Sequence, residues 1–298
     1  MIILITGSSG FVGSALVHSL TGEGHSVVRL VRRPVVGDDE VQWDPARGSL
    51  DPEALAGVEA VVHLAGESLA EGRWTATKKA RIRDSRLNGT RLLSEAIAGM
   101  SSPPNVLVSA SAKDYYGDRG AELLPENSPA GSDFLAEVIQ QWETACGPAA
   151  DAGIRVVNMR SGLVLDRGGG ALAKMLLPFR LGIGGRLGNG RQYMPWVSLE
   201  DMVRVIAHCI KTESVEGPVN VAAPQVVTNA EFTRALGRAV SRPTLFPVPA
   251  FALRVLFGEV AHALLASARL DPSKLMSTGF KFKHPTLDEA LQAALRGR

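Results

Sequence analysis

The stretch that decides the fold is MIILITGSSGFVG, residues 1–13. Residues 2–6 form a short, mainly apolar run, which is typical of a strand buried on both faces of a sheet. A loop with glycines at 7, 10 and 13 follows at once, and the apolar residues after it recur at helical spacing. A strand, a glycine turn and a helix in this order predict the first βαβ unit of a dinucleotide-binding fold.

Each glycine of this loop has its own physical role. Gly7 permits the tight turn out of the strand, Gly10 lets the backbone approach a pyrophosphate, and Gly13 lets the helix pack close to the sheet. The start of the helix presents free N–H groups and the positive end of its dipole to phosphates. We therefore expect Gly7, Gly10, Phe11, Val12 and Gly13 to contact a dinucleotide, and the alternative is a purely structural glycine turn.

The rest of the chain continues the alternation of strand and helix. Strands are predicted at 26–31, 58–64, 106–109 and 155–159, and helices at 78–98 and 134–150. Intervals of about 30 residues predict right-handed βαβ units and an α/β fold with a doubly wound parallel sheet, the Rossmann architecture. We expect this domain to span 1–165, with 191–225 returning to it, and a small, mostly helical C-terminal substrate-side subdomain to comprise 166–190 and 226–298.

Composition excludes several classes of protein. Of the 298 residues, 45% are hydrophobic and 21% charged, which excludes disorder as the main state. A formal net charge of +2 argues against a partner held by bulk charge, so we expect neither nucleic acid nor a membrane surface. The two cysteines form no C-x-x-C and fit a reducing compartment, so a cytoplasmic location is expected. The six histidines have no ligand-like spacing, so no metal site is expected.

The most apolar late stretch is residues 250–270. Charged residues within it, among them Arg254 and Glu259, argue against a membrane span. Leu253, Leu256, Phe257, Val260 and Leu264 recur at helical spacing. This pattern predicts an amphipathic helix that packs on its own protein, and a membrane- or partner-binding helix is the alternative.

The end of the second strand indicates which nucleotide is bound. NAD-binding proteins usually place an acidic residue there to bond the ribose 2′-hydroxyl, whereas this chain has Val31 followed by Arg32 and Arg33. Guanidinium groups suit a 2′-phosphate through charge-assisted, bidentate hydrogen bonds. We therefore predict NADP(H) rather than NAD(H), and the alternative is that both arginines are solvated loop charges.

Further motifs are distributed over essentially the whole chain. They include ITGSSGFVG (5–13), HLAGES (63–68), DSRLNGTRLL (84–93), SASAKDYYG (109–117), WE (142–143), MRSGLVLDRGGGAL (159–172), LPFRLGIGG (177–185), PWVSLEDM (195–202) and LDPSKLMSTGFKFKHP (270–285). In these motifs the sequence resembles the extended short-chain dehydrogenase/reductase superfamily. Within it, the chain is similar to the epimerase family proteins, which are NAD-dependent epimerase/dehydratase-like and carry a C-terminal domain of unknown function.

The resemblance implies a set of cofactor contacts. These are Leu64, Ala65 and Gly66 beside the adenosine, Arg86 on the cofactor, Ser109 near the nicotinamide, and Arg160, Ser161 and Gly162 leading into a loop over the nicotinamide that reaches Val164. Several of these positions have plainer alternatives. Leu64 and Ala65 are also suitable core residues, Arg86 a surface helix charge, and Ser161 a cap or turn residue.

One part of the superfamily pattern is missing. Its chemistry needs a tyrosine as acid or base and a lysine four residues later, whose charge lowers the tyrosine pKa. The three tyrosines here, Tyr115, Tyr116 and Tyr193, are followed four residues later by arginine, glycine and valine. The segment that corresponds to the pair is FLAEV, 134–138, in which phenylalanine has no proton to give and valine no charge.

Two residues remain as candidate catalytic groups. Ser111 resembles the superfamily's serine, and Tyr116 matches its Tyr-Gly element, which usually forms a wall of the site. The sequence thus predicts an NADP(H)-binding oxidoreductase or epimerase-like protein that acts on an unknown small molecule without the usual relay. The alternative is a non-catalytic NADP(H)-binding sensor or scaffold. Whether the protein is an enzyme, and its oligomeric state, stay open at this point.

Overall fold

A seven-stranded parallel sheet forms the centre of the protein in the computed structural model, which describes residues 1–69 and 72–296. Its strands are β1 (Ile2–Thr6), β2 (Ser26–Val31), β3 (Glu40–Gln42), β4 (Ala60–His63), β5 (Val106–Ala112), β7 (Arg155–Ser161) and β10 (Gly217–Val221). Their spatial order is β10-β7-β5-β4-β1-β2-β3, so the direction of winding reverses beside β1. The predicted Rossmann fold is confirmed, and ligands of such sheets bind at the reversal, outside the carboxyl ends of the strands.

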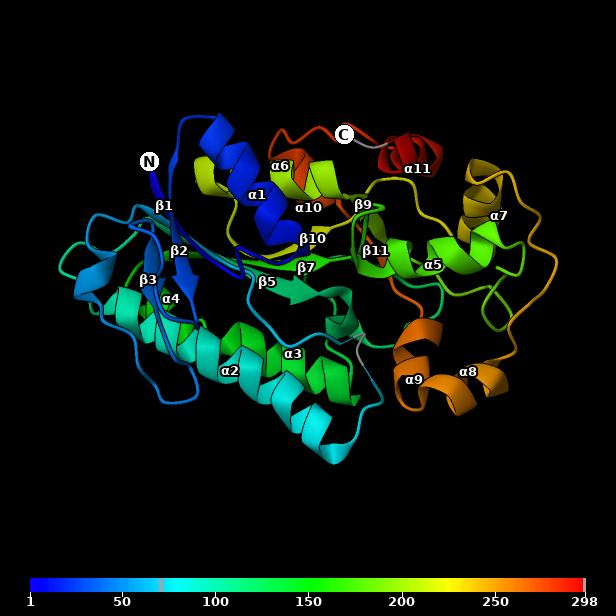
Figure 1. The fold of residues 1–298 in the computed structure, drawn as a ribbon, viewed down its shortest axis with the longest axis horizontal. Helices are drawn as coiled ribbons and strands as arrows, with labels where there is room; N and C mark the ends of the chain where they lie inside the picture. Colours follow the sequence, from blue (N-terminus) through cyan, green and yellow to red (C-terminus); the bar gives the residue numbers. More distant parts are fainter. Residues whose placement is uncertain (70–71, 297–298) are drawn as a thin grey trace.

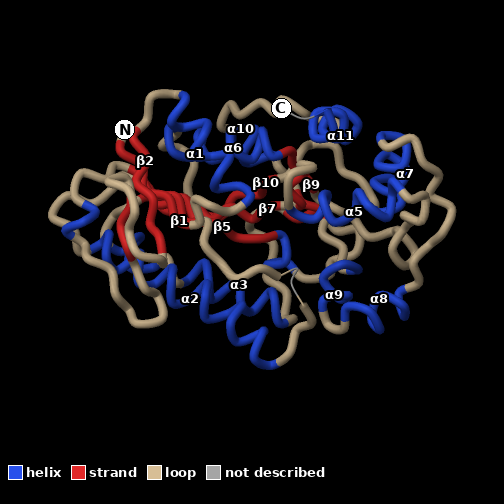
Figure 2. The backbone as a smooth tube through the Cα atoms, viewed as in Figure 1, coloured by secondary structure: helices blue, strands red, loops and turns tan. Residues whose placement is uncertain are grey.

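Helices cover both faces of the sheet (Figures 1 and 2). One layer contains α1 (Phe11–Gly22), α6 (Leu199–Lys211) and α10 (Ser273–Ser277); the other contains α2 (Ala76–Ala98), α3 (Phe134–Thr144) and α4 (Gly147–Asp151). Ile3 and Ile5 pack in the core of the α1 and α6 layer, whereas Leu4 packs in the core on the α2 and α4 side. This alternation follows from the two-residue period of a strand.

Five helices of the C-terminal half gather at one end of the molecule (Figure 1). Its helices are α5 (Gly170–Arg180), α7 (Asn229–Ala239), α8 (Ala250–Phe257), α9 (Val260–Leu265) and α11 (Leu287–Arg296). Two small sheets join this end to the main body: β8 (Leu163–Leu165) with β9 (Trp196–Ser198), and β6 (Leu123–Leu124) with β11 (Arg269–Leu270). Trp196 and Phe232 lie in its own apolar core. The short helices η1 (Glu53–Leu55) and η2 (Lys113–Tyr116) complete the fold.

The prediction of one helix over 134–150 is wrong, because α3 ends at Thr144 and α4 begins at Gly147. Pro148 lies in the first turn of α4. Proline lacks the N–H that would continue the ladder of hydrogen bonds, and its ring clashes with the preceding turn. The chain therefore starts a new helix here, and α3 leads from the sheet edge with its own N-cap, Asp133.

The prediction for residues 250–270 is also wrong in part. The segment forms two helices separated at Gly258, whose φ of 60° lies in the left-handed region. Leu253 is buried, but Leu256 and Phe257, which we expected to pack on the protein, are exposed. In the described ranges no helix combines the length and the apolarity that crossing a membrane requires.

Candidate functional site

The glycine loop forms a cradle between β1, β4 and α1. Gly7 has a φ of 68°, and a Cβ atom on it would lie 2.9 Å from the carbonyl carbon of Leu64. A Cβ atom on Gly13 would lie 2.1 Å from the Gly7 oxygen. Gly10, the N-cap of α1, brings no side chain to the helix start. The first-turn N–H groups of α1 are therefore left to an anion, which fits the pyrophosphate of a dinucleotide.

A second glycine turn closes over the start of α1. Cβ atoms on Gly169 and Gly170 would lie 2.5 Å and 3.0 Å from the Phe11 ring. The ring of Phe11 is thus held by the turn that follows β8, and Val164 packs against the same core as Phe11 and Val12. This contact places the predicted Val164 loop beside the glycine cradle.

The two arginines after β2 have different surroundings. Arg33 donates two hydrogen bonds to the buried carboxylate of Glu40, at 2.8 Å and 2.5 Å. The hydrogen bond from Arg33 lowers the pKa of Glu40 to about 2. Arg32 is exposed and makes no hydrogen bond or ion pair with any residue that the structure describes. Its charge acts on Glu67 from a distance and contributes, after Lys78 and Arg81, to lowering the pKa of that carboxyl. Arg32 is therefore the cation available to a ligand, and Arg33 braces the loop beside it.

A series of buried hydrogen bonds between side chains fixes the end of β4. Thr6 Oγ1 accepts the N–H groups of Leu64 and Ala65, at 3.1 Å and 3.2 Å, and lies 2.7 Å from His63 Nδ1. Because the Thr6 oxygen already accepts two N–H groups, the Thr6 hydroxyl donates its own proton to His63 Nδ1. The ring proton of His63 is then on Nε2, which lies 2.9 Å from Thr90 Oγ1. Burial lowers the pKa of His63 to about 4, so the imidazole is neutral.

Arg86 lies beneath the loop that follows β4. Its Nη1 donates to the backbone oxygens of Glu67 and Ile82, both at 3.1 Å. Its guanidinium carbon lies 5.0 Å from the centre of the Trp142 ring, and burial lowers its pKa to about 10. A Cβ atom on Gly66 would lie 3.4 Å from that carbon. Arg86 is thus a buried support for Gly66, and the surface-charge alternative is wrong.

A buried ion pair links the ends of β5 and β7 to α3. Arg160 Nε and Nη2 donate to the two carboxylate oxygens of Glu143, each at 2.8 Å. Ser111 Oγ donates to Glu143 Oε1 at 2.6 Å. Sequence reasoning assigned no role to Glu143; its only signal was its place in the WE motif. The Arg160 side chain is therefore committed to this buried network and is not available to a ligand.

The structure contradicts the catalytic role of Tyr116. Its side chain is fully buried, its hydroxyl donates to Asn220 Oδ1 at 2.8 Å, and Arg160 Nη1 donates to it at 3.0 Å. Burial raises the pKa of this phenol. The proton of Ser111 is likewise given to Glu143. Neither hydroxyl proton is directed at a substrate position, because both complete a structural network.

The remaining predicted contacts lie along the carboxyl edge of the sheet. Ser109 is buried in the middle of β5, where its hydroxyl donates to the Ala110 oxygen at 3.3 Å. Ser161 Oγ donates to the Ser111 oxygen at 3.3 Å, and a Cβ atom on Gly162 would lie 2.6 Å from the Pro195 carbonyl. Gly162 thus connects β7 to β8 at a point where the backbone packs closely against residues 195–196. The carboxyl ends of β1, β4, β5 and β7 are neighbours along one edge of the sheet.

A cavity of about 240 Å³ lies between η2, the start of α3 and α9. Its lining comprises Trp74, Asp114, Gly117, Asp133, Phe134, Leu135, Glu259, His262, Ala263 and Ala266. Phe134 begins the FLAEV segment, 134–138, which the resemblance predicts to correspond to the superfamily's tyrosine–lysine pair. Beside Phe134, His262 Nδ1 lies 4.0 Å from Asp133 Oδ2.

Sequence reasoning missed this pair. Asp133 carried only an N-cap signal, and His262 had no pattern that pointed to a site. Among the residues with described positions, no group of three or more histidine, cysteine, aspartate or glutamate side chains could hold a metal ion.

Two family models match the chain. Residues 3–222 match the NAD dependent epimerase/dehydratase family, and residues 248–294 match a domain of unknown function, DUF1731. The epimerase family protein Mb2239 of Mycobacterium bovis is 46% identical over 291 residues, which cover 97% of this chain and 96% of the relative. The epimerase family protein SDR39U1 of Bos taurus is 38% identical over 300 residues, which cover 99% of this chain and 100% of the relative.

Solved structures give the same result. Human epimerase family protein SDR39U1 (isoform 2), crystallised with NADPH, superimposes with a TM-score of 0.92 at 35% identity and covers all of both chains. The nucleoside-diphosphate sugar epimerase of Corynebacterium glutamicum has a TM-score of 0.83 at 33% identity, covering 99% of this chain and 58% of that one.

Proposed function

Because the chain belongs to the NAD-dependent epimerase/dehydratase family, we propose that it binds NADP(H) and acts as an oxidoreductase or epimerase-like enzyme on a small molecule. One observation carries the choice of cofactor: Arg32, exposed and unpaired within the described part of the chain, follows β2 beside the glycine cradle. A 2′-phosphate would receive hydrogen bonds from this guanidinium, whereas a ribose hydroxyl would have no carboxylate to bond. The NADPH held by the similar human protein supports the same choice.

Residues of this chain bind and orient the cofactor. The N–H groups at the start of α1 bind the pyrophosphate, and the glycines at 7 and 13 leave room for it. The Glu143–Arg160 ion pair fixes the ends of β5 and β7, which border the nicotinamide half of the cleft. When bound, the nicotinamide supplies the hydride chemistry.

The cavity at Phe134 is the proposed substrate site. Phe134 and Val138 have no proton or charge to offer, and the hydroxyls of Ser111 and Tyr116 are occupied. His262, whose Nδ1 lies 4.0 Å from Asp133 Oδ2, is the imidazole on the cavity wall. We assign proton exchange with the substrate to this imidazole, and its orientation to Asp133.

A non-catalytic NADP(H)-binding sensor is the second candidate. One observation favours it: both hydroxyls expected in the relay donate their protons to protein acceptors, Glu143 and Asn220. In this case the cleft binds the cofactor, and the network under β5 and β7 has only a structural role.

Calorimetric titration of the protein with NADPH and NADH tests the cofactor assignment. We expect tighter binding of NADPH, and a loss of about tenfold, or 1.4 kcal/mol, in NADPH affinity for Arg32→Ala with NADH affinity unchanged. Arg238→Ala is the control, because Arg238 is 63% exposed and lies on α7, at the C-terminal end of the molecule. Equal or tighter binding of NADH by the wild-type protein would contradict the proposal.

Oxidation of NADPH in the presence of a library of carbonyl compounds tests the enzyme assignment. For any compound that is reduced, we expect His262→Asn to lower kcat about 100-fold or more, with NADPH affinity unchanged. His18→Asn, a substitution of an exposed histidine in α1, is the control. Tight NADPH binding with no turnover across the library favours the sensor.

A further inference from the structure

Basic residues are concentrated in two segments of the chain, 167–199 and 232–258. Together these segments contain nine arginines and lysines and no aspartate or glutamate, although the whole chain has a formal net charge of only +2. The nine are Arg167, Lys174, Arg180, Arg186, Arg191, Arg234, Arg238, Arg242 and Arg254. The rest of the chain is therefore net acidic, and the near-neutral total conceals a strongly basic part.

The two segments lie side by side. Arg242 Nε donates to the Arg180 oxygen at 3.0 Å, and the Val248 N–H donates to the Arg186 oxygen at 2.8 Å. At Gly185 a Cβ atom would lie 1.7 Å from the Phe246 oxygen. Figure 1 shows α5, α7 and α8 at the same end of the molecule. The two segments thus form one basic end.

Large apolar side chains are exposed at this end. Leu177, Leu181, Ile183, Leu245, Phe246, Phe251, Val255 and Leu256 are each at least 59% exposed, and Phe257 is 44% exposed. These nine residues come from the end of α5 and the turn after it, from the connection between α7 and α8, and from α8. Clustered exposure of this kind marks a binding surface. We call these residues, with Arg180, Arg234, Arg242 and Arg254, the basic–apolar face.

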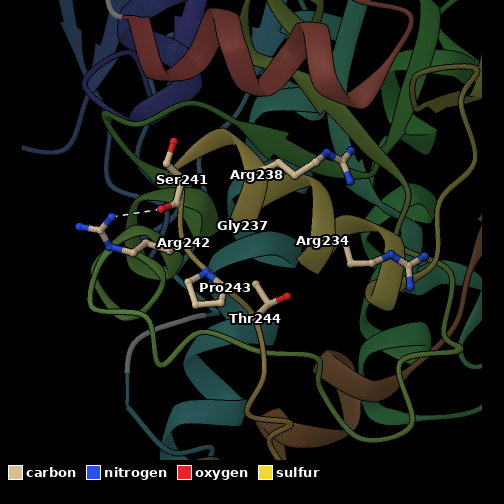
Figure 3. A pocket seen from close by; sticks show the side chains of 7 residues that line it. All are labelled: Arg234, Gly237, Arg238, Ser241, Arg242, Pro243 and Thr244. Carbon is tan, nitrogen blue, oxygen red and sulfur yellow. Dashed lines mark hydrogen bonds between the residues drawn. The ribbon is translucent and has the colours of Figure 1, made fainter.

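An open groove at the end of α7 adjoins the apolar residues. Arg234, Gly237, Arg238, Ser241, Arg242, Pro243 and Thr244 line it, and its volume is about 520 Å³ (Figure 3). Arg238 is paired with Asp288 of α11 at 2.9 Å, whereas Arg234 has no such partner within residues 1–69 and 72–296. Arg234 and Arg242 lie toward opposite sides of the groove in Figure 3. Guanidinium and hydroxyl groups around an open groove suit a phosphate.

We propose that the basic–apolar face docks on an anionic lipid surface. Phe251, Leu256 and the other apolar residues of the basic–apolar face enter the boundary between lipid headgroups and acyl chains. The arginines of the same face contact the lipid phosphates. The positive charge of this face favours an anionic lipid surface over a second copy of the chain. A second copy of the chain on a two-fold axis would bring the same arginines together, and like charges there oppose association.

Sedimentation of the full-length protein with lipid vesicles tests the proposal. Vesicles of phosphatidylcholine alone are compared with vesicles of equal parts phosphatidylcholine and phosphatidylglycerol. We expect binding to the anionic vesicles only, weakened by salt. The double variant Phe251→Ser/Leu256→Ser and the double variant Arg234→Ala/Arg242→Ala should each bind at least tenfold more weakly. Met276→Ser and Arg47→Ala, which lie outside the face, should bind as the wild-type protein does.

Three outcomes overturn the proposal. One is that the wild-type protein does not sediment with the anionic vesicles. Another is a concentration-dependent dimer that Phe251→Ser/Leu256→Ser abolishes, which assigns the face to a second copy. The third is undiminished vesicle binding by that variant, which shows that charge acts without the apolar residues. Unchanged NADPH affinity in each variant checks that the fold is intact, so this result is separate from the test of the cofactor site.

Discussion

Glu143 and Arg160 form a two-point ion pair, with both nitrogen–oxygen distances at 2.8 Å, in the layer between α3 and the ends of β5 and β7. The Arg160 side chain is 3% exposed and that of Glu143 12%. The pair connects Ser111 on one side to Tyr116 and Asn220 on the other. Through this ion pair, the hydroxyls of Ser111 and Tyr116, which were candidates for catalysis, belong to a buried structural network instead.

Removing the carboxylate leaves a buried arginine without its partner. For Glu143→Gln we expect a loss of about 3 kcal/mol in the free energy of unfolding, because an unpaired buried charge is costly. Denaturant unfolding followed by circular dichroism measures it. Glu137→Gln, on the exposed side of the same helix, should change stability by less than about 0.5 kcal/mol. Similar stabilities for the two variants would contradict the role of the pair.

The variant Tyr116→Phe tests whether the Tyr116 hydroxyl has a structural or a catalytic role. The variant loses the hydrogen bonds to Asn220 and Arg160, so we expect a destabilisation of about 1–3 kcal/mol. NADPH affinity, and turnover of any substrate found, should stay within about twofold of wild type, because no proton of this hydroxyl faces the cleft. Lost turnover with unchanged stability would restore Tyr116 as the acid.

Gly13→Ala tests the close contact of α1 with the glycine loop. The new Cβ atom would lie 2.1 Å from the Gly7 oxygen, so the loop must move. We expect NADPH affinity, measured by calorimetry, to fall by tenfold or more, about 1.4 kcal/mol. Gly22→Ala in the same helix meets nothing within 4 Å and should raise stability by roughly 0.5–1 kcal/mol without affecting affinity. Equal NADPH affinity in the two variants would show that the cradle does not hold the cofactor.

His63 should make the fold sensitive to mild acid. Its pKa is about 4 in the folded protein, below the ordinary value of 6.5, so between these pH values the unfolded chain binds the extra proton. The contribution is absent above pH 6.5, and stability falls as the pH is lowered toward 4, by about 3 kcal/mol in all. Unfolding free energies measured across this window should slope less steeply for His63→Gln than for wild type.

The exposed His18 provides the comparison for this pH dependence. His18→Gln should keep the wild-type slope, because the His18 side chain is exposed to solvent in the folded protein. If His63→Gln and His18→Gln have the same slope, the acid sensitivity comes from other groups.

Local sequence patterns determined the architecture. The strand and glycine loop at 1–13 fixed the first βαβ unit, because burial on both faces and the contact at Gly13 each tolerate few side chains. The arginines after β2 and the absence of a Tyr-x-x-x-Lys pair were also visible. Where patterns were ambiguous, as at Pro148 and Gly258, the break between helices was missed.

Only the tertiary structure decided what each polar side chain does. Arg32 and Arg33 are neighbours in sequence, but only Arg33 meets Glu40. His262 lies near Asp133 because α9 packs against the start of α3, 129 positions away along the chain. Likewise, the exposure of Leu256 and the grouping of nine basic residues depend on how α5, α7 and α8 pack. Periodicity specifies which residues share a face, but a partner far away in the sequence determines whether that face is covered.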